Sequence, residues 1–341
     1  MIRDLVICCP SLCFALAFSS MAAEGRWTML APLPRAMTEI VATAANGKLY
    51  VMAGLQRAGP LGAVDEYDAG ADRWTAKRPM PVPAHHVMTA AYKDRIYVFG
   101  GFVRPPGGEG WLPIDNAWEY DPRTDSWKAL APMPTRRGAG TAVEFDGRIY
   151  VIGGANAPDA AKVSAESVLM SVGTVEEYDP MQNRWRSRKT MPTPRNHFTA
   201  GAVGGKIYAI GGRIGDAKIT RSSNTDVVEE YDPATDEWNL RARMPTARSG
   251  TAGAVYEGRI FVLGGEYQTD QVMMAFRACE AYRPTTDRWE ELPHMQAPRH
   301  GLAAALLGTR LHALGGDFRS AGVPGVEAHL ASHEALEIPK Q

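Results

Sequence analysis

Arginine recurs at one position of a repeated loop. Four copies of the loop carry it four residues after a methionine, at Arg137, Arg195, Arg248 and Arg299. Two further copies have Met37 and Ala84 at this position. Because guanidinium groups bind carboxylates and phosphates in a two-pronged fork, we expect converging arginines to form a site for an anion. The alternative is that each arginine pairs with an acid or a backbone carbonyl of a neighbouring loop.

Side chains that can transfer protons stand two residues after this arginine position. Glu39, His86 and His197 occupy the place in three copies, whereas the others have Ala139, Gly250 and Gly301. A carboxylate and imidazoles are groups suited to general acid–base catalysis. Glu39, His86 and His197 are therefore the candidate catalytic residues.

Other candidates lie next to these positions or in long loops. His300 follows Arg299, and Arg213, Glu266 and Asp317 each follow a glycine pair and are expected to point into the same funnel. Trp111 stands in the loop "FVRPPGGEGWLPIDN", where it either contacts a sugar or protein or folds back over the channel. The candidate ligand-binding residues are Arg137, Arg195, Arg213, Arg248, Arg299, His300 and Trp111.

No metal and no cofactor are expected. His85 and His86 are adjacent and would point to opposite faces of a strand, which is a weak pattern for a metal site. The chain has no G-x-S-x-G, H-E-x-x-H, P-loop or Cys-x-x-Cys motif. Cys279 is the one cysteine after residue 22, and it stands in an apolar position shared with Val64 and Val175, so we expect an unreactive core residue.

The elements that position these side chains are six repeats of about fifty residues, a period typical of propeller blades. Each repeat has a tryptophan, with Leu or Met six residues later: Trp27, Trp74, Trp127, Trp185, Trp238 and Trp289. In five of them a tyrosine precedes the tryptophan by seven residues: Tyr67, Tyr120, Tyr178, Tyr231 and Tyr282. Segments such as "GRIYVIGG" separate these units. Tyrosine, tryptophan and glycine pairs at fixed spacing are interpreted as scaffold.

Each repeat predicts four antiparallel strands whose two apolar faces can be buried only against neighbouring repeats. The last repeat lacks its tryptophan strand, whereas Trp27 has no preceding strands of its own. We therefore expect "GRWTML" to supply the outer strand of the sixth blade and to close the ring.

The order "GG", "EYDP", "W", "PMPxxR" resembles the kelch repeat over residues 24–338. The first repeat departs from it at Ala53, and the last has Leu336 in the tyrosine position. The resemblance implies an all-β, six-bladed β-propeller in which the long loops after the glycine pairs and the arginine loops emerge on one face. In size, blade count and leader the chain is similar to the exported bacterial sialic acid mutarotases. Galactose-oxidase-like kelch proteins need a cysteine crosslinked to a copper ligand, so Cys279 in a core position argues against a copper oxidase.

The termini and charge suggest a location and exclude some partners. Residues 1–22 resemble a secretory signal with cleavage after Ala22 or Ala23, so residues 23–341 form the propeller and the protein is expected to be periplasmic or secreted. The 37 basic and 38 acidic residues are dispersed, giving a formal charge of −1. This pattern does not favour nucleic acid, and no membrane insertion is expected after signal removal. We expect a monomer.

Two functions are compatible with these patterns. One is a non-catalytic binding module for an anionic or carbohydrate ligand, or for a protein partner, at the channel mouth. The other is a sialic acid mutarotase or epimerase, which needs an acid, a base and an anchor for the carboxylate.

Overall fold

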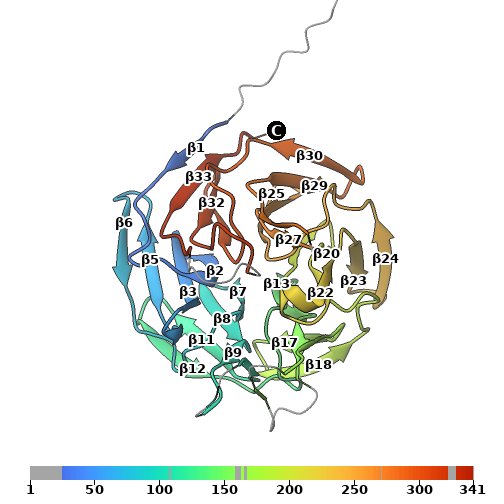
Figure 1. Cartoon of the computed structure of the whole chain (residues 1–341). Helices are drawn as coiled ribbons and strands as arrows, with labels where there is room; N and C mark the ends of the chain where they lie inside the picture. Colours follow the sequence, from blue (N-terminus) through green and yellow to red (C-terminus); the bar gives the residue numbers. More distant parts are fainter. Residues whose placement is uncertain are drawn as a thin grey trace, which may run out of the picture.

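The computed structural model describes residues 25–340 except 107, 109, 158–162, 165–166, 270 and 322–327. These residues form a closed ring of six sheets around a central axis (Figure 1). The sequence-based prediction of a six-bladed propeller with four antiparallel strands per blade is confirmed. The proposed signal segment and its cleavage site lie outside the described residues.

Each blade runs from an innermost strand near the axis to an outermost strand at the rim. In that order, the first three blades are β2(Thr38–Ala45), β3(Lys48–Gln56), β5(Val64–Asp68), β6(Arg73–Ala76); β7(Met88–Tyr92), β8(Arg95–Phe99), β11(Ala117–Asp121), β12(Ser126–Ala129); and β13(Thr141–Phe145), β14(Arg148–Ile152), β17(Val175–Asp179), β18(Arg184–Arg188). The last three are β19(Thr199–Val203), β20(Lys206–Ile210), β23(Val228–Asp232), β24(Glu237–Arg241); β25(Ala252–Tyr256), β26(Arg259–Leu263), β29(Cys279–Arg283), β30(Arg288–Leu292); and β31(Ala303–Leu307), β32(Arg310–Leu314), β33(His333–Glu337), β1(Trp27–Met29).

Short hairpins follow the glycine pairs on one face of the ring. They comprise β4(Gly59–Pro60), which pairs with β3, and the pairs β9(Phe102–Val103) with β10(Leu112–Pro113), β15(Ala155–Asn156) with β16(Met170–Ser171), β21(Arg213–Gly215) with β22(Ser222–Asn224), and β27(Glu266–Gln268) with β28(Met273–Ala275). One turn of 3-10 helix, η2(Ile219–Arg221), precedes β22. Isolated bridges such as His85 to Phe102 and Asn196 to Arg213 join these hairpins to the arginine loops. The loops after the glycine pairs and the arginine loops therefore meet, as the repeat pattern predicted.

Strand β1 closes the ring against the last blade (Figure 1). Trp27 lies opposite Leu336 in the antiparallel pair, and its indole Nε1 donates a hydrogen bond to the carbonyl of Pro293 at 2.6 Å. The chain ends thus share one sheet, which leaves no unpaired edge between the first and last blades. The predicted closure is confirmed.

The repeated tyrosine and tryptophan tie neighbouring blades together. In blade four, the Tyr231 hydroxyl donates to Asp236 at 2.5 Å, and Asp236 also accepts from the backbone N–H of Lys189 in the preceding blade at 2.9 Å. The indole of Trp238 donates to the carbonyl of Lys189 at 3.0 Å. The same exchange recurs in the other four blades that have the tyrosine, so these residues are scaffold, as the pattern indicated.

Close backbone approach explains the glycine pairs. Gly100 has φ +53°, and a Cβ atom there would lie 2.2 Å from the carbonyl oxygen of Arg137. That carbonyl accepts a hydrogen bond from the N–H of Gly101 at 3.0 Å, which fixes the arginine loop against the blade. Glycine meets both demands at Gly100 without a steric clash, whereas the first blade has Ala53 at this position with φ +64°.

The core lies between adjacent blades. One cluster joins Tyr150 and Ile152 of the third blade to Ile207 and Ala209 of the fourth. Cys279 is fully buried in a cluster with Leu263, and burial raises the pKa of its thiol, which agrees with the unreactive core residue expected from the repeats. Among the described residues, no helix has the length and apolar character needed to span a bilayer.

Candidate functional site at the channel mouth

A ring of six backbone hydrogen bonds surrounds the channel mouth. It is formed by one residue of each repeat, two positions after the arginine position, and we call these six residues the mouth ring. They are Glu39, His86, Ala139, His197, Gly250 and Gly301. Each donates its N–H to the carbonyl of the preceding member, with donor–acceptor distances between 2.7 and 3.4 Å, and Glu39 closes the circle by donating to Gly301.

All six residues of the mouth ring have a left-handed backbone. The φ angles are +54° at Glu39, +55° at His86 and +54° at His197, compared with +64° at Gly250. This conformation is natural for glycine but costs a residue with a Cβ about 1 kcal/mol or more. A Cβ is thus retained at four positions, Ala139 included, where the last two repeats have glycine. Strain of this kind clusters at functional sites.

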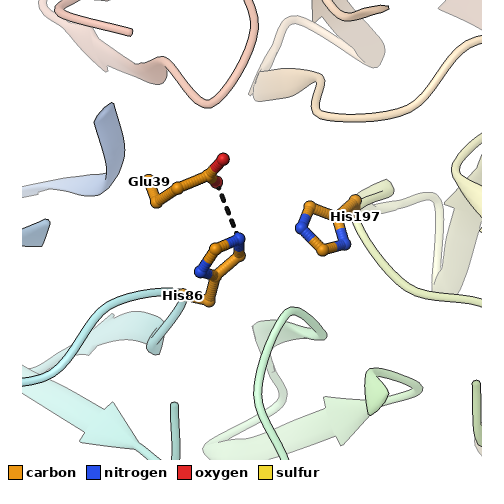
Figure 2. A group of neighbouring side chains, drawn as sticks. All are labelled: Glu39, His86 and His197. Atoms are coloured by element: carbon orange, nitrogen blue, oxygen red, sulfur yellow. Dashed lines mark ion pairs between the residues drawn. The ribbon is translucent and has the colours of Figure 1, made fainter. Parts of the chain in front are cut away.

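Glu39, His86 and His197 come together at the centre of the mouth (Figure 2). Glu39 Oε2 lies 2.9 Å from His86 Nε2, and the imidazole rings of His86 and His197 have centroids 4.6 Å apart. One donor atom from each residue lies within 4.8 Å of the others. The three candidate catalytic residues of the sequence analysis therefore form one cluster. Sequence comparison of the repeats found them because they share one position.

Burial and charge set the state of this cluster. Burial acts to raise the pKa of Glu39, but the contact with His86 outweighs it and holds that pKa well below its usual range. Burial, with the charge of Arg213, holds the pKa of His197 well below its usual value. Glu39 is therefore a carboxylate and His197 a neutral imidazole at neutral pH.

Asn196 fixes the tautomer of His197. The Asn196 side-chain N–H groups donate to Ser171 Oγ at 2.8 Å and to the carbonyl of Asp216 at 3.3 Å, so its Oδ1 faces Arg213 and accepts from Nε at 3.2 Å. His197 Nδ1 also contacts this Oδ1 and must donate to it. The proton therefore sits on Nδ1, and Nε2 presents its lone pair to the cluster.

Arg213, Glu266 and His300 surround the cluster. Arg213 Nη1 donates to Glu266 Oε1 at 3.0 Å, and Glu266 Oε2 accepts from Ser320 at 2.9 Å and from the N–H of Ala321 at 2.7 Å. His300 Nε2 lies 3.9 Å from Glu39 and 3.7 Å from Glu266. Arg213 and His300 thus stand at the mouth, as the sequence analysis expected, whereas Asp317 lies by His329.

Trp111 folds back onto the mouth. Its ring centroid lies 4.9 Å from that of His85 and 4.8 Å from that of His86, and it stacks on Phe102 at 5.5 Å. The structure therefore shows the second alternative of the sequence analysis, in which Trp111 folds back over the channel. The indole also borders a pocket of about 340 Å³, whose other lining residues are Glu39, Gly110, Arg213, Ala217, Lys218, Ile219, Thr220 and Ala321.

The side chains of the four repeated arginines are buried inside the blades and do not line the mouth pocket. Their side chains are at most 1 % exposed, and each forms an ion pair within its own blade: Arg137 with Glu176, Arg195 with Glu229, Arg248 with Glu280 and Arg299 with Glu334. Arg137 also donates to the carbonyls of Gly153 and Val151 at 3.0 Å. The expectation that these arginines are open to an anion at the mouth is wrong, because acids and carbonyls already occupy their donors. They act as loop staples.

A signal for these pairs was present in the repeats. The glutamate follows the first residue of the third strand in the four blades that have the arginine. The first two blades lack the arginine and have Asp65 and Trp118 at the glutamate position, and Asp65 pairs with Arg35 instead. In each blade the arginine and the glutamate are therefore either both present or both absent, which indicated that they pair.

The side chains of His85 and His86 converge rather than diverge. Their Nδ1 atoms are in contact and their ring centroids are 4.6 Å apart. The prediction that they point to opposite faces is wrong because His86 lies outside any strand and has a positive φ, which breaks the alternation of a strand.

Comparisons with known proteins agree with the repeat pattern. A family model described as the KLHDC2/KLHL20/DRC7 Kelch-repeats domain matches residues 131–316, more than half of the chain, and a Kelch motif matches residues 85–134. Kelch-like protein 25 of Xenopus tropicalis is 32% identical over 60% of this chain and 32% of its own length. Kelch-like protein terF of Aspergillus terreus is 26% identical over 83% of this chain and 50% of its own length.

The chain spans about a third to a half of the length of these two relatives. Among solved structures, that titled "Structure of YjhT" superposes with a TM-score of 0.71, covering 90% of this chain and 96% of its own, at 18% identity. At this identity the likeness concerns the fold.

Proposed function

Because the chain belongs to the kelch-repeat family, whose propellers generally bind proteins or smaller ligands, we propose that its mouth pocket binds a small polar ligand of the carbohydrate class. The observation that carries the proposal is the pocket of about 340 Å³ bordered by Trp111, Glu39 and Arg213. Its volume falls in the range of small-molecule sites, in which an aromatic wall and a few fixed polar groups orient the ligand.

The charges at the mouth favour a polyhydroxyl ligand over a simple anion. The carboxylates of Glu39 and Glu266 balance the charges of Arg213 and Lys218, so the pocket has no excess positive charge. Hydroxyl groups can both donate to the carboxylates and accept from the guanidinium. A sugar that carries its own carboxylate remains compatible, because Arg213 and Lys218 both line the pocket.

Saturation-transfer NMR with a panel of neutral, amino and acidic sugars tests this proposal. We expect transfer to at least one sugar, and a loss of affinity of about tenfold or more in Trp111→Ala. Trp118→Ala is the matched control, because Trp118 is a half-buried indole in β11 and is not part of the pocket lining. No transfer to any sugar, or equal affinity in Trp111→Ala and wild type, would contradict the proposal and favour a protein partner.

A second candidate is mutarotation of the bound sugar, and the contact between Glu39 and His86 favours it. Mutarotation requires one group that takes a proton from the anomeric hydroxyl and one that returns a proton to the ring oxygen. The Glu39 carboxylate is the base in this proposal, and His86, whose Nε2 pairs with it, is the acid, because the proton of His197 is held on Nδ1 by Asn196. NMR exchange spectroscopy of the anomeric protons measures the rate, which we expect to fall by about a hundredfold or more in Glu39→Gln. If adding the wild-type protein does not change the exchange rate of the anomeric protons, this candidate is excluded.

Export remains part of the proposal. Residues 1–22 have the layout of a signal peptide, with Arg3 before an apolar run and small residues at the end. Mass spectrometry of the protein from its native host should find an N-terminus at Ala23 or Glu24. A peptide containing Cys8 in the purified protein would contradict export with cleavage.

A further inference from the structure

The mouth cluster has the composition of a transition-metal site. Two imidazoles and one carboxylate offer donor atoms within 4.8 Å of one another. A tetrahedral ion with bonds of about 2.1 Å holds its ligand atoms roughly 3.4 Å apart. The separation of 2.9 Å between Glu39 and His86 and the 4.8 Å limit of the group bracket this value, so small side-chain rotations suffice.

The imidazole of His197 presents a buried nitrogen that has no hydrogen-bond partner among the described residues. Nε2 of His197 is buried, and its lone pair is free because Nδ1 holds the proton. Nε2 of His86 pairs with Oε2 of Glu39 at 2.9 Å, and a metal ion would take the place of the proton between them. A buried nitrogen lone pair without a donor is costly, and a metal ion would satisfy Nε2 of His197.

Outer contacts orient these ligands in the manner of known metal sites. Metal-bound histidines generally donate their second N–H to an oxygen or another acceptor. His197 donates from Nδ1 to Asn196, which is itself held by Arg213 and Ser171. With a metal ion on Nε2, His86 would carry its proton on Nδ1, which contacts Nδ1 of His85 as an acceptor.

Two carboxylates stand beside the cluster. Glu39 contacts His86, and Glu266 pairs with Arg213, while Lys218 lines the same pocket as Glu39. Glu266 is occupied by Arg213, Ser320 and Ala321, so it contributes charge without leaving its partners. The carboxylate of Glu39 would supply the one negatively charged ligand of a divalent ion at this cluster.

We propose that Glu39, His86 and His197 bind a divalent transition-metal ion of the zinc class, with the fourth coordination position open to the mouth pocket. Two nitrogens and one oxygen suit Zn²⁺ or Co²⁺, whereas Mg²⁺ and Ca²⁺ require mostly oxygen ligands. The open position follows from Glu39, which lines the pocket. The sequence analysis expected no metal because it placed the imidazoles of His85 and His86 on opposite faces. The inference does not depend on the proposed sugar, since the ligand atoms all come from the protein.

The test uses the full chain stripped with EDTA and then titrated with Zn²⁺ against a chromophoric chelator, with Co²⁺ absorption as a report of geometry. We expect one Zn²⁺ per chain and intense Co²⁺ bands typical of four-coordination. Glu39→Gln, which keeps the shape of the side chain, should weaken Zn²⁺ binding by about tenfold or more, and so should His197→Gly. Neither Mg²⁺ nor Ca²⁺ should compete.

His294→Gln is the matched control, because His294 forms an exposed contact with Glu291 at 2.8 Å. It should bind Zn²⁺ as the wild type does. The inference is wrong if the wild type binds no Zn²⁺ at millimolar concentration, if His294→Gln abolishes binding, or if both mouth variants retain wild-type affinity. Unfolding midpoints of the apo variants check that each is folded. Sugar binding measured without metal decides the proposed function separately.

Discussion

Arg195 and Glu229 form a fully buried ion pair, with 2.7 Å between Nη2 and Oε2. The guanidinium also donates to the carbonyls of Val227 at 2.8 Å and Ala209 at 3.1 Å. Burial lowers the pKa of Arg195 to about 10, so the side chain is still charged at neutral pH. The pair joins the arginine loop to two strands of its own blade.

Arg195→Ala should destabilise the fold by about 3 to 5 kcal/mol, because it leaves the charge of Glu229 buried without a partner. Equilibrium unfolding in denaturant measures this. Arg243→Ala is the control, because Arg243 pairs with Asp226 at 2.5 Å but is 65% exposed, so its loss should cost less than about 1 kcal/mol. Equal effects of the two substitutions would refute the role of Arg195 as a staple.

Trp27→Ala should cost about 3 to 5 kcal/mol of unfolding free energy, since it leaves a cavity in the apolar cluster that joins the first and last strands. Met29→Ala in the same strand is the control, because Met29 is exposed and should change stability by less than about 0.5 kcal/mol. Urea unfolding of both variants compares them. A stability of Trp27→Ala within error of wild type would show that β1 does not hold the ring closed.

The buried pair His312 and His333 should make stability depend on pH. Burial lowers the pKa of His312 to about 3 and that of His333 to about 4, and the two rings are joined by a hydrogen bond of 2.8 Å. In the unfolded chain both histidines bind a proton near pH 6.5. Their contribution to the free energy of unfolding is therefore complete above that pH. It is lost as pH falls toward 4 and then 3, at up to about 1.4 kcal/mol per pH unit for each residue.

His312→Phe is the matched variant, since the fifth repeat has Phe261 at the same position. The difference in unfolding free energy between pH 7 and pH 4.5 should be smaller in this variant than in wild type, because one titrating imidazole is gone. If the free energy of unfolding changes with pH in the same way in both proteins, the buried pair is not the source of the pH dependence.

His197→Gly should leave stability unchanged or raise it by up to about 1 kcal/mol, because Gly250 and Gly301 occupy the same left-handed position. Thermal and denaturant unfolding measure the change. His300→Gly, at a position without positive φ, is the comparison and should be destabilising. A loss of more than about 2 kcal/mol in His197→Gly would mean that this side chain supports the fold.

The repeats predicted the fold because each blade residue has the same structural role six times. Trp27 without preceding strands and a last repeat without tryptophan were enough to predict ring closure. The site was only partly predictable. Position in the repeat identified Glu39, His86 and His197, but the direction of His85 and His86 depends on a positive φ that the pattern did not reveal.

The arginines show why charge alone misleads. Arg137 and its equivalents were assigned to the mouth from their place in the loop, but their partners lie 32 to 39 residues further along, at Glu176 and its equivalents. A contact across such a separation is visible only when both positions are compared among repeats. The role of Asn196 in setting the tautomer of His197 depends on three-dimensional contacts and had no signal in the sequence.

The indole N–H signal of Trp111 in a ¹H–¹⁵N spectrum, assigned by Trp111→Phe, tests the central claim most directly. Titration with the sugar identified by saturation transfer should shift this signal saturably. The indole of Trp185, whose Nε1 donates to the carbonyl of Ala131 at 2.9 Å between blades, should stay unchanged. Saturable binding of the sugar without any shift of the Trp111 signal would contradict the account and place the ligand site away from the channel mouth.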